Sequence, residues 1–187
     1  APVTETPRHE LMVTAPGGFS DLLLAELREA GAEAVEERTY GGRCLATLET
    51  AYRLCLESRI ASRVLLVLAR VPAATPEELY DGVKSVDWST VFTPGATFAI
   101  DAKATASQLT HTQFITLKAK DAVVDQIREK TSGRPDIDPV APDLRLHIRL
   151  SKDVATVALD LAGEPLHRRG YRARGVAAPM KENLAAG

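Results

Sequence analysis

Residues 144–161 read LRLHIRLSKDVATVALDL, and their strict alternation of apolar and polar side chains decides the fold. Apolar residues take every second position on both sides of Lys152-Asp153. A two-residue turn there sets Ile148 opposite Val157 and brings all the apolar pairs onto one face, whereas a three-residue loop would set leucines opposite polar side chains. The segment therefore predicts an antiparallel hairpin with one dry and one wet face.

The wet face of this hairpin carries Arg145, His147 and Arg149, which are a candidate phosphate-binding set. The same register places Arg145 across from Asp160. Because an internal ion pair with Asp160 accounts for at least one of these three side chains, we favour a salt-bridged surface over a nucleic-acid contact here.

Upstream of the hairpin, the periodicity predicts two further groups of elements. Residues 10–71 follow the ferredoxin-like order, and the strand at 63–71 is apolar on both faces, as expected of a covered, central strand. The elements expected in this part are strands at 10–15, 34–35, 45–48 and 63–71 and helices at 19–30 and 50–60. Next come a short helix at 77–83, a loop packed by Trp88 and Phe92, a strand at 96–103 and a helix at 111–130. The fold class is α/β (α+β).

Composition restricts the class of protein. The 187 residues are 45% hydrophobic and 26% charged, with a net charge of −2, which indicates a globular chain rather than a disordered one. Aromatic residues make up only 5%, few for a protein that stacks on unpaired bases. Cys44 and Cys55 fit no zinc motif and indicate a reducing compartment. No apolar run is long enough to span a membrane, so we expect a cytoplasmic protein with no membrane partner.

The sequence contains no motif for catalysis. It has no GxGxxG, GxxxxGK[ST] or GxSxG segment, and its histidines lack HxxxH spacing. Asp136 and Asp138 form a carboxylate pair, but a solvated turn before Pro139 accounts for them better than metal binding or acid–base chemistry. We therefore expect no catalytic residue, bound cofactor or metal within these residues.

Basic residues are the remaining candidates for function. Residues 166–175, LHRRGYRARG, contain Arg168, Arg169 and Arg172 and no acid, which suits bidentate phosphate contacts, although a salt-bridged linker explains them equally well. Lys118 and Lys120 lie near the amino end of the long helix, where free N–H groups favour phosphate. Ordinary pairing of Lys118 with Asp121 is the alternative there. Arg134, beside Gly133 in a loop, is a weaker candidate.

Several blocks in the same order resemble the amino-terminal region of the bacterial large-subunit ribosomal RNA guanine-N2 methyltransferase family. The resemblance extends from about residue 10 to the end of the chain. The blocks include ESRIASRVLL (57–66), VDWSTVFTPGATFAI (86–100), LKAKDAVVDQIR (117–128), RPDIDPVAPDLRLHI (134–148), ATVALDLAGEPLHRRGYR (155–172) and APMKENLAAG (178–187).

The resemblance implies a ferredoxin-like amino-terminal subdomain followed by a THUMP domain. It implies an amino-terminal part at 1–49, whose last helix and strand extend to about 72, a THUMP domain at 50–162, and at 163–187 a basic linker and the start of a truncated methyltransferase domain. It also implies binding of structured ribosomal RNA, which is presented to a methyltransferase domain of the same parent chain that uses S-adenosylmethionine. The cofactor loop and catalytic motif of that domain are not found in this sequence.

For single residues the resemblance implies less. It gives a general role to Arg168, Arg169, Tyr171 and Arg172, which match the segment joining the THUMP region to the methyltransferase. Gln113 matches the family form, whereas the residues on either side of it depart from that form.

Two other functions remain compatible with the sequence. In one, the arginine segment docks on the methyltransferase domain and the region is a scaffold that does not bind RNA. In the other, the THUMP region belongs to an enzyme that thiolates or methylates transfer RNA.

Overall fold

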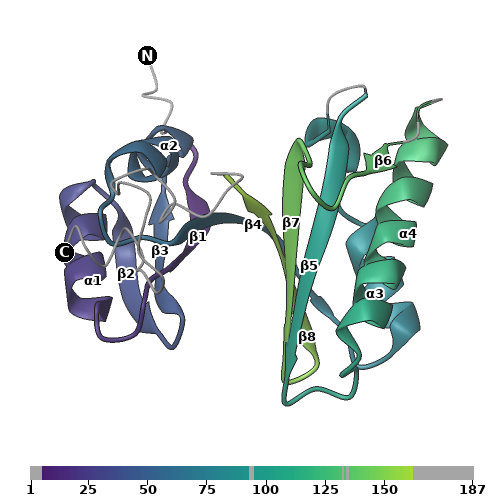
Figure 1. The fold of residues 1–187 in the computed structure, drawn as a ribbon, viewed down its shortest axis with the longest axis horizontal. Coiled ribbons are helices and arrows are strands. Elements are labelled where there is room, and N and C mark those ends of the chain that lie inside the picture. The colour runs from purple at the N-terminus through teal and green to yellow at the C-terminus, as the bar shows by residue number, and fades with distance from the viewer. Residues whose placement is uncertain (1–5, 93–94, 132, 134, 162–187) are drawn as a thin grey trace, which may run out of the picture. The chain divides into compact units, whose positions relative to one another are not determined.

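The computed structural model describes residues 6–92, 95–131, 133 and 135–161. These residues form two compact units that divide between Leu66 and Val67. Each unit has its own sheet and its own pair of helices, so the two are described separately (Figure 1).

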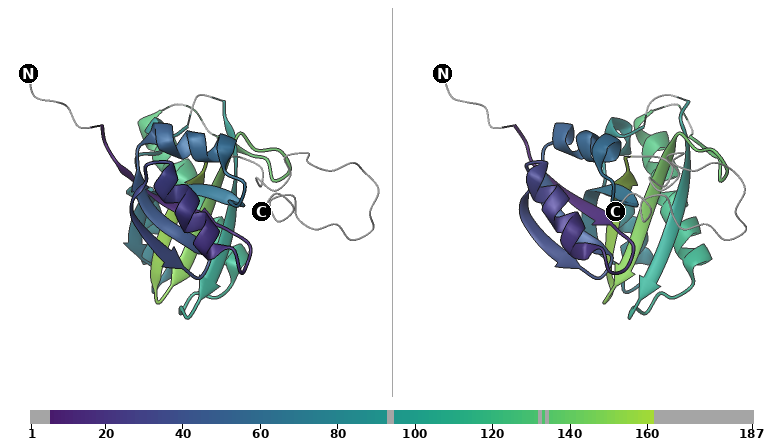
Figure 2. Two further views of the ribbon diagram at one scale, coloured as in Figure 1. Left: turned by 90° about the vertical axis from the view of Figure 1, so that its left-hand side faces the viewer. Right: turned by 60° about the vertical axis from the view of Figure 1, so that its left-hand side comes forward.

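The first unit has the ferredoxin-like order that the sequence predicts. Its strands pair antiparallel in the order β2-β3-β1-β4, and both helices lie on one side of this sheet (Figure 2). Its elements are β1 (His9–Thr14), α1 (Ser20–Glu29), β2 (Glu33–Arg38), β3 (Gly41–Ala46), α2 (Leu48–Glu57) and the first part of β4 (Arg63–Pro72).

Helix α1 packs closely on β3 because two glycines leave room for it. A Cβ at Gly42 would lie 3.1 Å from side-chain carbons of both Leu24 and Leu27, which the helix buries. A Cβ at Gly41 would lie 2.3 Å from the carbonyl oxygen of Val13. No larger residue fits at these positions without moving β1 or α1.

The strand predicted at 45–48 is wrong at its end. Strand β3 stops at Ala46, and Leu48 begins α2 instead. Thr47 caps the helix, since its side-chain oxygen accepts a hydrogen bond from the Thr50 N–H at 3.2 Å. Residues 45–48 look like a strand in the sequence, but the helix begins within them because Thr47 caps its first turn.

The second unit places two helices on one face of a mixed sheet (Figure 1). The strand order is β4-β8-β7-β5-β6, with β7 antiparallel to β8 and β5 parallel to both β7 and β6. Its elements are the second part of β4, α3 (Pro76–Lys84), a 3₁₀ turn (Trp88–Thr90), β5 (Thr97–Thr105), α4 (Thr112–Lys130), β6 (Asp136–Ile137), β7 (Leu144–Ser151) and β8 (Val154–Asp160).

Trp88 is at the centre of the second unit's core. Its side chain is fully buried, and its indole N–H donates to the Val83 carbonyl oxygen at 2.8 Å. The ring of Phe92 stands edge-on to both Trp88 and Phe98, with centroids 6.1 and 5.2 Å away. The prediction of a loop packed by Trp88 and Phe92 is therefore confirmed.

The predicted face of α4 is confirmed as well. The residues expected to point inward are all buried, and they pack against the dry face of the β7–β8 hairpin within one hydrophobic core. These residues are Ile115, Ala119, Ala122, Val123 and Ile127.

The predicted register of the hairpin is confirmed. Ile148 pairs with Val157 and Leu150 with Ala155 across a turn at Lys152 and Asp153. Both turn residues have positive φ, 50° and 62°, which a two-residue turn between twisted strands requires.

The turn is tied to the rest of the unit through Asp153. Its carbonyl oxygen accepts from the Ala73 N–H at 2.8 Å, and its carboxylate accepts from the Gln108 N–H at 2.7 Å. Its own N–H donates to the Ser107 hydroxyl at 3.2 Å. One residue thus connects the end of β4, the loop after β5 and the hairpin.

The expectation that both faces of the strand at 63–71 are covered is wrong. Val64 and Leu65 are buried in the first unit and Val71 in the second, but Leu66 to Ala69 are only half-buried. Strand β4 pairs with β1 as far as Leu66 and lies beside β8 in the second unit. Its predicted central position is confirmed, since β4 lies between β1 and β8, but its apolar run contributes to two units in turn rather than being buried on two faces.

Gly82 offers a test of this packing. A Cβ there would lie 2.5 Å from Cβ and Cγ2 of Val71. Alanine is favoured over glycine within a helix by about 1 kcal/mol, so propensity alone predicts that Gly82→Ala stabilises α3. We expect the opposite, a loss of about 1–3 kcal/mol in the free energy of unfolding from overpacking, measured by urea denaturation.

Two further variants make this result specific. Gly17→Ala is the control, because nothing lies within 4 Å of a Cβ at Gly17. In a Val71→Ala background the cost of Gly82→Ala should shrink but not vanish, since both Cγ methyl groups are gone while the Cβ at 2.5 Å remains. A gain in stability from Gly82→Ala alone would show that the contact does not constrain the helix.

The two cysteines differ in a way that can be measured. Cys44 is fully buried in β3, and burial raises the pKa of its thiol to about 11, whereas Cys55 is half-buried. At pH 8 only about one Cys44 thiol in a thousand would be ionised. We expect Ellman's reagent to label one thiol per native chain and two in urea, and Cys55→Ser to leave the native chain unreactive. Fast labelling of native Cys55→Ser would contradict this.

Candidate nucleic-acid interface

Most of the predicted arginine sites lie outside the described residues. These are Arg134 in the loop after α4 and Arg168, Arg169, Tyr171 and Arg172 in the basic segment. The structure therefore places only the candidates on α4 and on the hairpin.

The α4 candidates do not form one cluster. Lys118 and Lys120 are two positions apart, which puts them about 200° apart around a helix, while Gln113 and Lys120 differ by only about 20°. Gln113 and Lys120 therefore lie on the flank towards β5, and Lys118 lies on the flank towards α3. The alternative explanation for Lys118, a pair with Asp121, is not found among the described residues, where Asp121 pairs with Lys120 at 3.5 Å.

Gln113 borders a shallow groove of about 430 Å³ between α4 and β5. Ile100 and Ala102 of β5 line one side, and Thr116 and Leu117 of α4 line the other. The amino end of α4 has no side-chain cap, so its first N–H groups are not satisfied by His111. The groove therefore has apolar side chains along its length, and at one end it has Gln113 and the uncapped N–H groups of α4.

The wet face of the hairpin is largely neutralised, as the sequence led us to favour. Arg145 donates to Asp101 at 3.0 Å, and His147 lies 3.3 Å from the fully buried carboxylate of Asp160. The sequence predicted that Arg145 lies across from Asp160 and pairs with it. In the structure Arg145 pairs with Asp101 instead, and His147 lies beside Asp160. Strand β5 explains the change, since it lies beside β7 and supplies Asp101 as a second acid.

Two cations on this face were not singled out from the sequence. Lys103 is exposed on β5, where it pairs with Arg149 across the ladder. Arg70, at the end of β4, donates to the hydroxyl of Thr156 at 3.0 Å. The alternation of residues 96–103 already put Lys103 on the polar face, but only the parallel pairing of β5 with β7 brings it beside the hairpin arginines.

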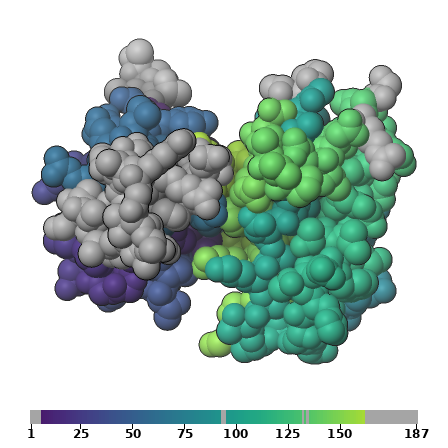
Figure 3. Space-filling model, in the orientation of Figure 1, coloured from purple at the N-terminus to yellow at the C-terminus, as the bar shows by residue number. Residues whose placement is uncertain are grey.

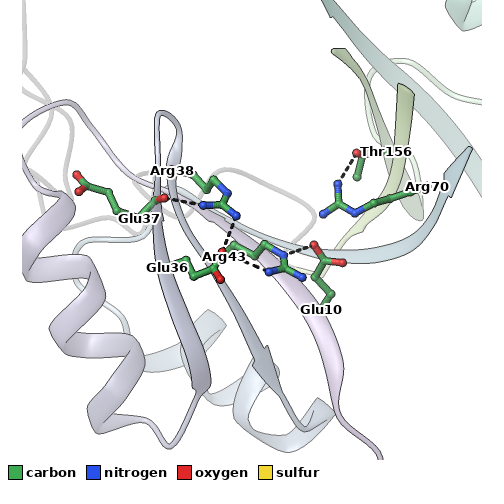
Figure 4. A network of polar contacts seen from close by, with 7 residues as sticks. All are labelled: Glu10, Glu36, Glu37, Arg38, Arg43, Arg70 and Thr156. Carbon is green, nitrogen blue, oxygen red and sulfur yellow. Dashed lines mark hydrogen bonds and ion pairs between the residues drawn. The ribbon is translucent and has the colours of Figure 1, made fainter. Parts of the chain in front are cut away.

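Two arginines on the sheet of the first unit, Arg38 and Arg43, are committed to internal pairs. Arg43 binds Glu10 at 2.6 Å and Glu36 at 3.4 Å, and Arg38 also binds Glu36 (Figure 4). The hydrogen bond to Glu10 raises the pKa of Arg43 despite partial burial. This network joins β1, β2 and β3, so it stabilises the sheet rather than offering positive charge to a ligand.

The described residues also hold no sign of a reactive centre. No group of three or more histidine, cysteine or acidic side chains in the described part is placed to hold a metal ion. Asp138 accepts from the N–H groups of Val140 and Ala141, both at 3.0 Å, which lowers its pKa and makes it a turn residue. None of the described helices is long and apolar enough to cross a membrane.

Comparison with known proteins agrees with the two units. The sequence model named "RlmL ferredoxin-like domain" matches residues 10–65, and that of the THUMP domain matches residues 73–160.

Relatives with curated names are similar over nearly the whole chain. The ribosomal RNA large subunit methyltransferase K/L of Methylococcus capsulatus is 49% identical over 95% of this chain and 24% of its own length. That of Stutzerimonas stutzeri is 48% identical over 97% of this chain and 25% of its own length. The chain therefore spans about a quarter of the length of the curated relatives that it matches.

Among solved structures, SMU.472, crystallised as a complex with SAH, superposes with a TM-score of 0.83 at 30% identity. The match covers 95% of this chain and 47% of SMU.472. The chain thus contains an RlmL-type ferredoxin-like domain followed by a THUMP domain, and over nearly its whole length it is similar to the ribosomal RNA large subunit methyltransferase K/L proteins.

Proposed function

We propose that this chain is the RNA-binding module of a ribosomal RNA methyltransferase that modifies the N2 atom of guanine. The match of residues 73–160 to the THUMP domain carries this proposal, supported by relatives at 49% identity that are named as ribosomal RNA methyltransferases. In this proposal the module holds structured ribosomal RNA while a separate catalytic domain of the same cytoplasmic protein methylates the base.

The methyl donor would be S-adenosylmethionine, bound outside these residues. The sequence contains no glycine-rich cofactor loop of the GxGxxG type. In this proposal the part of the chain in the reaction is to bind and orient RNA. The crystallisation of SMU.472 with SAH supports a donor of this type for the family's catalytic domain.

The RNA contact would be electrostatic and directed by shape. Lys103 and Lys118 have no ion-pair partner within the described residues, while the arginines at 38, 43 and 145 do. The basic segment adds Arg168, Arg169 and Arg172 from a stretch without acids. With few aromatic residues for base stacking, a grip on the backbone of a stem fits this composition best.

The experiment measures binding of a fluorescent ribosomal RNA stem-loop by anisotropy across a series of KCl concentrations. Affinity should fall with salt at a log–log slope of roughly −0.9 for each phosphate neutralised. Arg168→Ala with Arg169→Ala should weaken binding at low salt and flatten the slope by about one to two units. Lys118→Ala should act in the same direction with about half the effect.

A charge-matched control removes two arginines that are already paired. Arg8→Ala with Arg53→Ala takes away the partners of Glu33 and Glu49, and it should leave the slope unchanged. Equal effects of the two double variants would contradict a role for the basic segment. Failure of the intact chain to bind the stem-loop at low salt would contradict the proposal and favour a scaffold. Stronger competition by transfer RNA than by ribosomal RNA would contradict the substrate class.

A further inference from the structure

Within the described part of the chain, strand β5 has a free edge over most of its length. On that side β6 reaches only as far as Phe98, whose carbonyl oxygen accepts from the Asp138 N–H at 3.1 Å. Because backbone groups of alternate residues point to the same side of a strand, those of Ile100, Ala102 and Ala104 face this edge as well. Within the described residues they have no hydrogen-bond partner.

The surface beside this edge is apolar, and none of the described residues covers it. The groove between β5 and α4 lies directly against Ile100 and Ala102. On α4, Leu117 is 54% exposed and Phe114 is 39% exposed. In the space-filling view, teal atoms of β5 reach the surface beside the green atoms of α4 (Figure 3). A row of unpaired backbone groups next to exposed apolar side chains is a template for an added strand.

The chemistry of the edge favours polypeptide over RNA. Its unpaired groups alternate between N–H donors and carbonyl acceptors. The phosphates of an RNA backbone offer acceptors only, and the ribose 2′-hydroxyl is its single donor in each nucleotide. An extended peptide backbone supplies both kinds of group at the spacing of a strand.

The charges next to the edge identify the partner. The open stretch, from Ala99 to Thr105, has Ala102 at its centre and reads AIDAKAT. We propose that β5 pairs antiparallel with β5 of a second copy of this chain about a two-fold axis at Ala102. That arrangement sets Asp101 of each copy opposite Lys103 of the other, in closely spaced pairs of opposite charge.

Only this register satisfies the charges. If the axis lay at Asp101 or at Lys103, each of those side chains would face its own copy and repel it. Lys103 is exposed and has no ion-pair partner within the described residues. Asp101 is 49% exposed and accepts from Arg145 only through its Oδ2, so its second oxygen is available.

The small side chains on the other face allow a close approach. Ala102 would meet itself across the axis, and Ile100 would meet Ala104. The stretch ends where the pairing must end, because β6 begins beside Phe98 and Ala106 has a φ of 48° that turns the chain out of the sheet. In the dimer, helix α4 of each copy would cover the exposed Leu117 side chain of the other copy.

Sedimentation velocity of the 187-residue chain tests this directly, at concentrations up to on the order of 200 µM. We expect a species of twice the 20.1 kDa chain mass, and slower hydrogen exchange at the amides of Ile100, Ala102 and Ala104 as concentration rises. Lys103→Asp should weaken dimerisation about tenfold or more, because both cross-strand pairs become repulsive. Lys152→Asp makes the same charge change at the exposed hairpin turn and should have no effect.

Two more variants keep the test decisive. Asp101→Lys should also weaken self-association, and an equimolar mixture with Lys103→Asp should restore it, since the mixed pair is complementary at both positions. Ala102→Pro removes the central N–H without breaking a bond to β7 and should leave a folded monomer. A chain that stays monomeric throughout overturns the proposal. So does a dimer that Lys103→Asp and Ala102→Pro leave intact, or one that the mixture fails to restore.

Discussion

The second unit depends on the two-residue turn at Lys152 and Asp153. Both residues hold a positive φ that side chains other than glycine rarely adopt. The turn persists because Asp153 forms hydrogen bonds with Ala73, Ser107 and Gln108, three residues from two other parts of the chain. A slip of one residue would turn every leucine of the hairpin towards water. The turn therefore fixes which side chains form the core and which face remains for ligands.

The hairpin and the long helix could be predicted from the sequence because their patterns are local. Alternation around Lys152-Asp153 leaves one register with matched pairs, and the apolar spacing of α4 leaves one inward face. Leu48 and the covered strand at 63–71 were misassigned for different reasons. A capping threonine outweighs a short strand pattern, and an apolar run does not reveal that it serves two sheets in turn.

The candidate site was harder to predict than the fold. The ion pairs of Arg145 and His147 depend on β5 lying parallel to β7, and a parallel neighbour is set by a crossover rather than by a turn. For that reason the alternation of residues 96–103 put Asp101 and Lys103 on a polar face but did not reveal that they lie beside the hairpin arginines. The lysines of α4 show the opposite case. Closeness in sequence suggested a cluster, but helical geometry separates Lys118 from Lys120.

Charge in this chain is mostly internal. Arg38 and Arg43 are engaged by Glu10 and Glu36, and Arg145 is engaged by Asp101. These cations are therefore not available to a phosphate, although the net charge of the chain is only −2. Among the described residues, Lys103 and Lys118 are cations without an ion-pair partner, and they lie on different elements. A module of this kind would gain its affinity from a few arginines in the basic segment and its shape from the two sheets.

Strand β4 limits how far the two domains can be treated as interchangeable parts. The match to the ferredoxin-like domain ends at residue 65, and the match to the THUMP domain begins at residue 73. Residues 63–72, however, form one uninterrupted strand. A protein engineer who cut between the domains would expose the bare flank of β1 in one piece and of β8 in the other, and both pieces would tend to aggregate. Chimaeras and truncations of this family should therefore be joined outside that strand, with its full length kept on both sides.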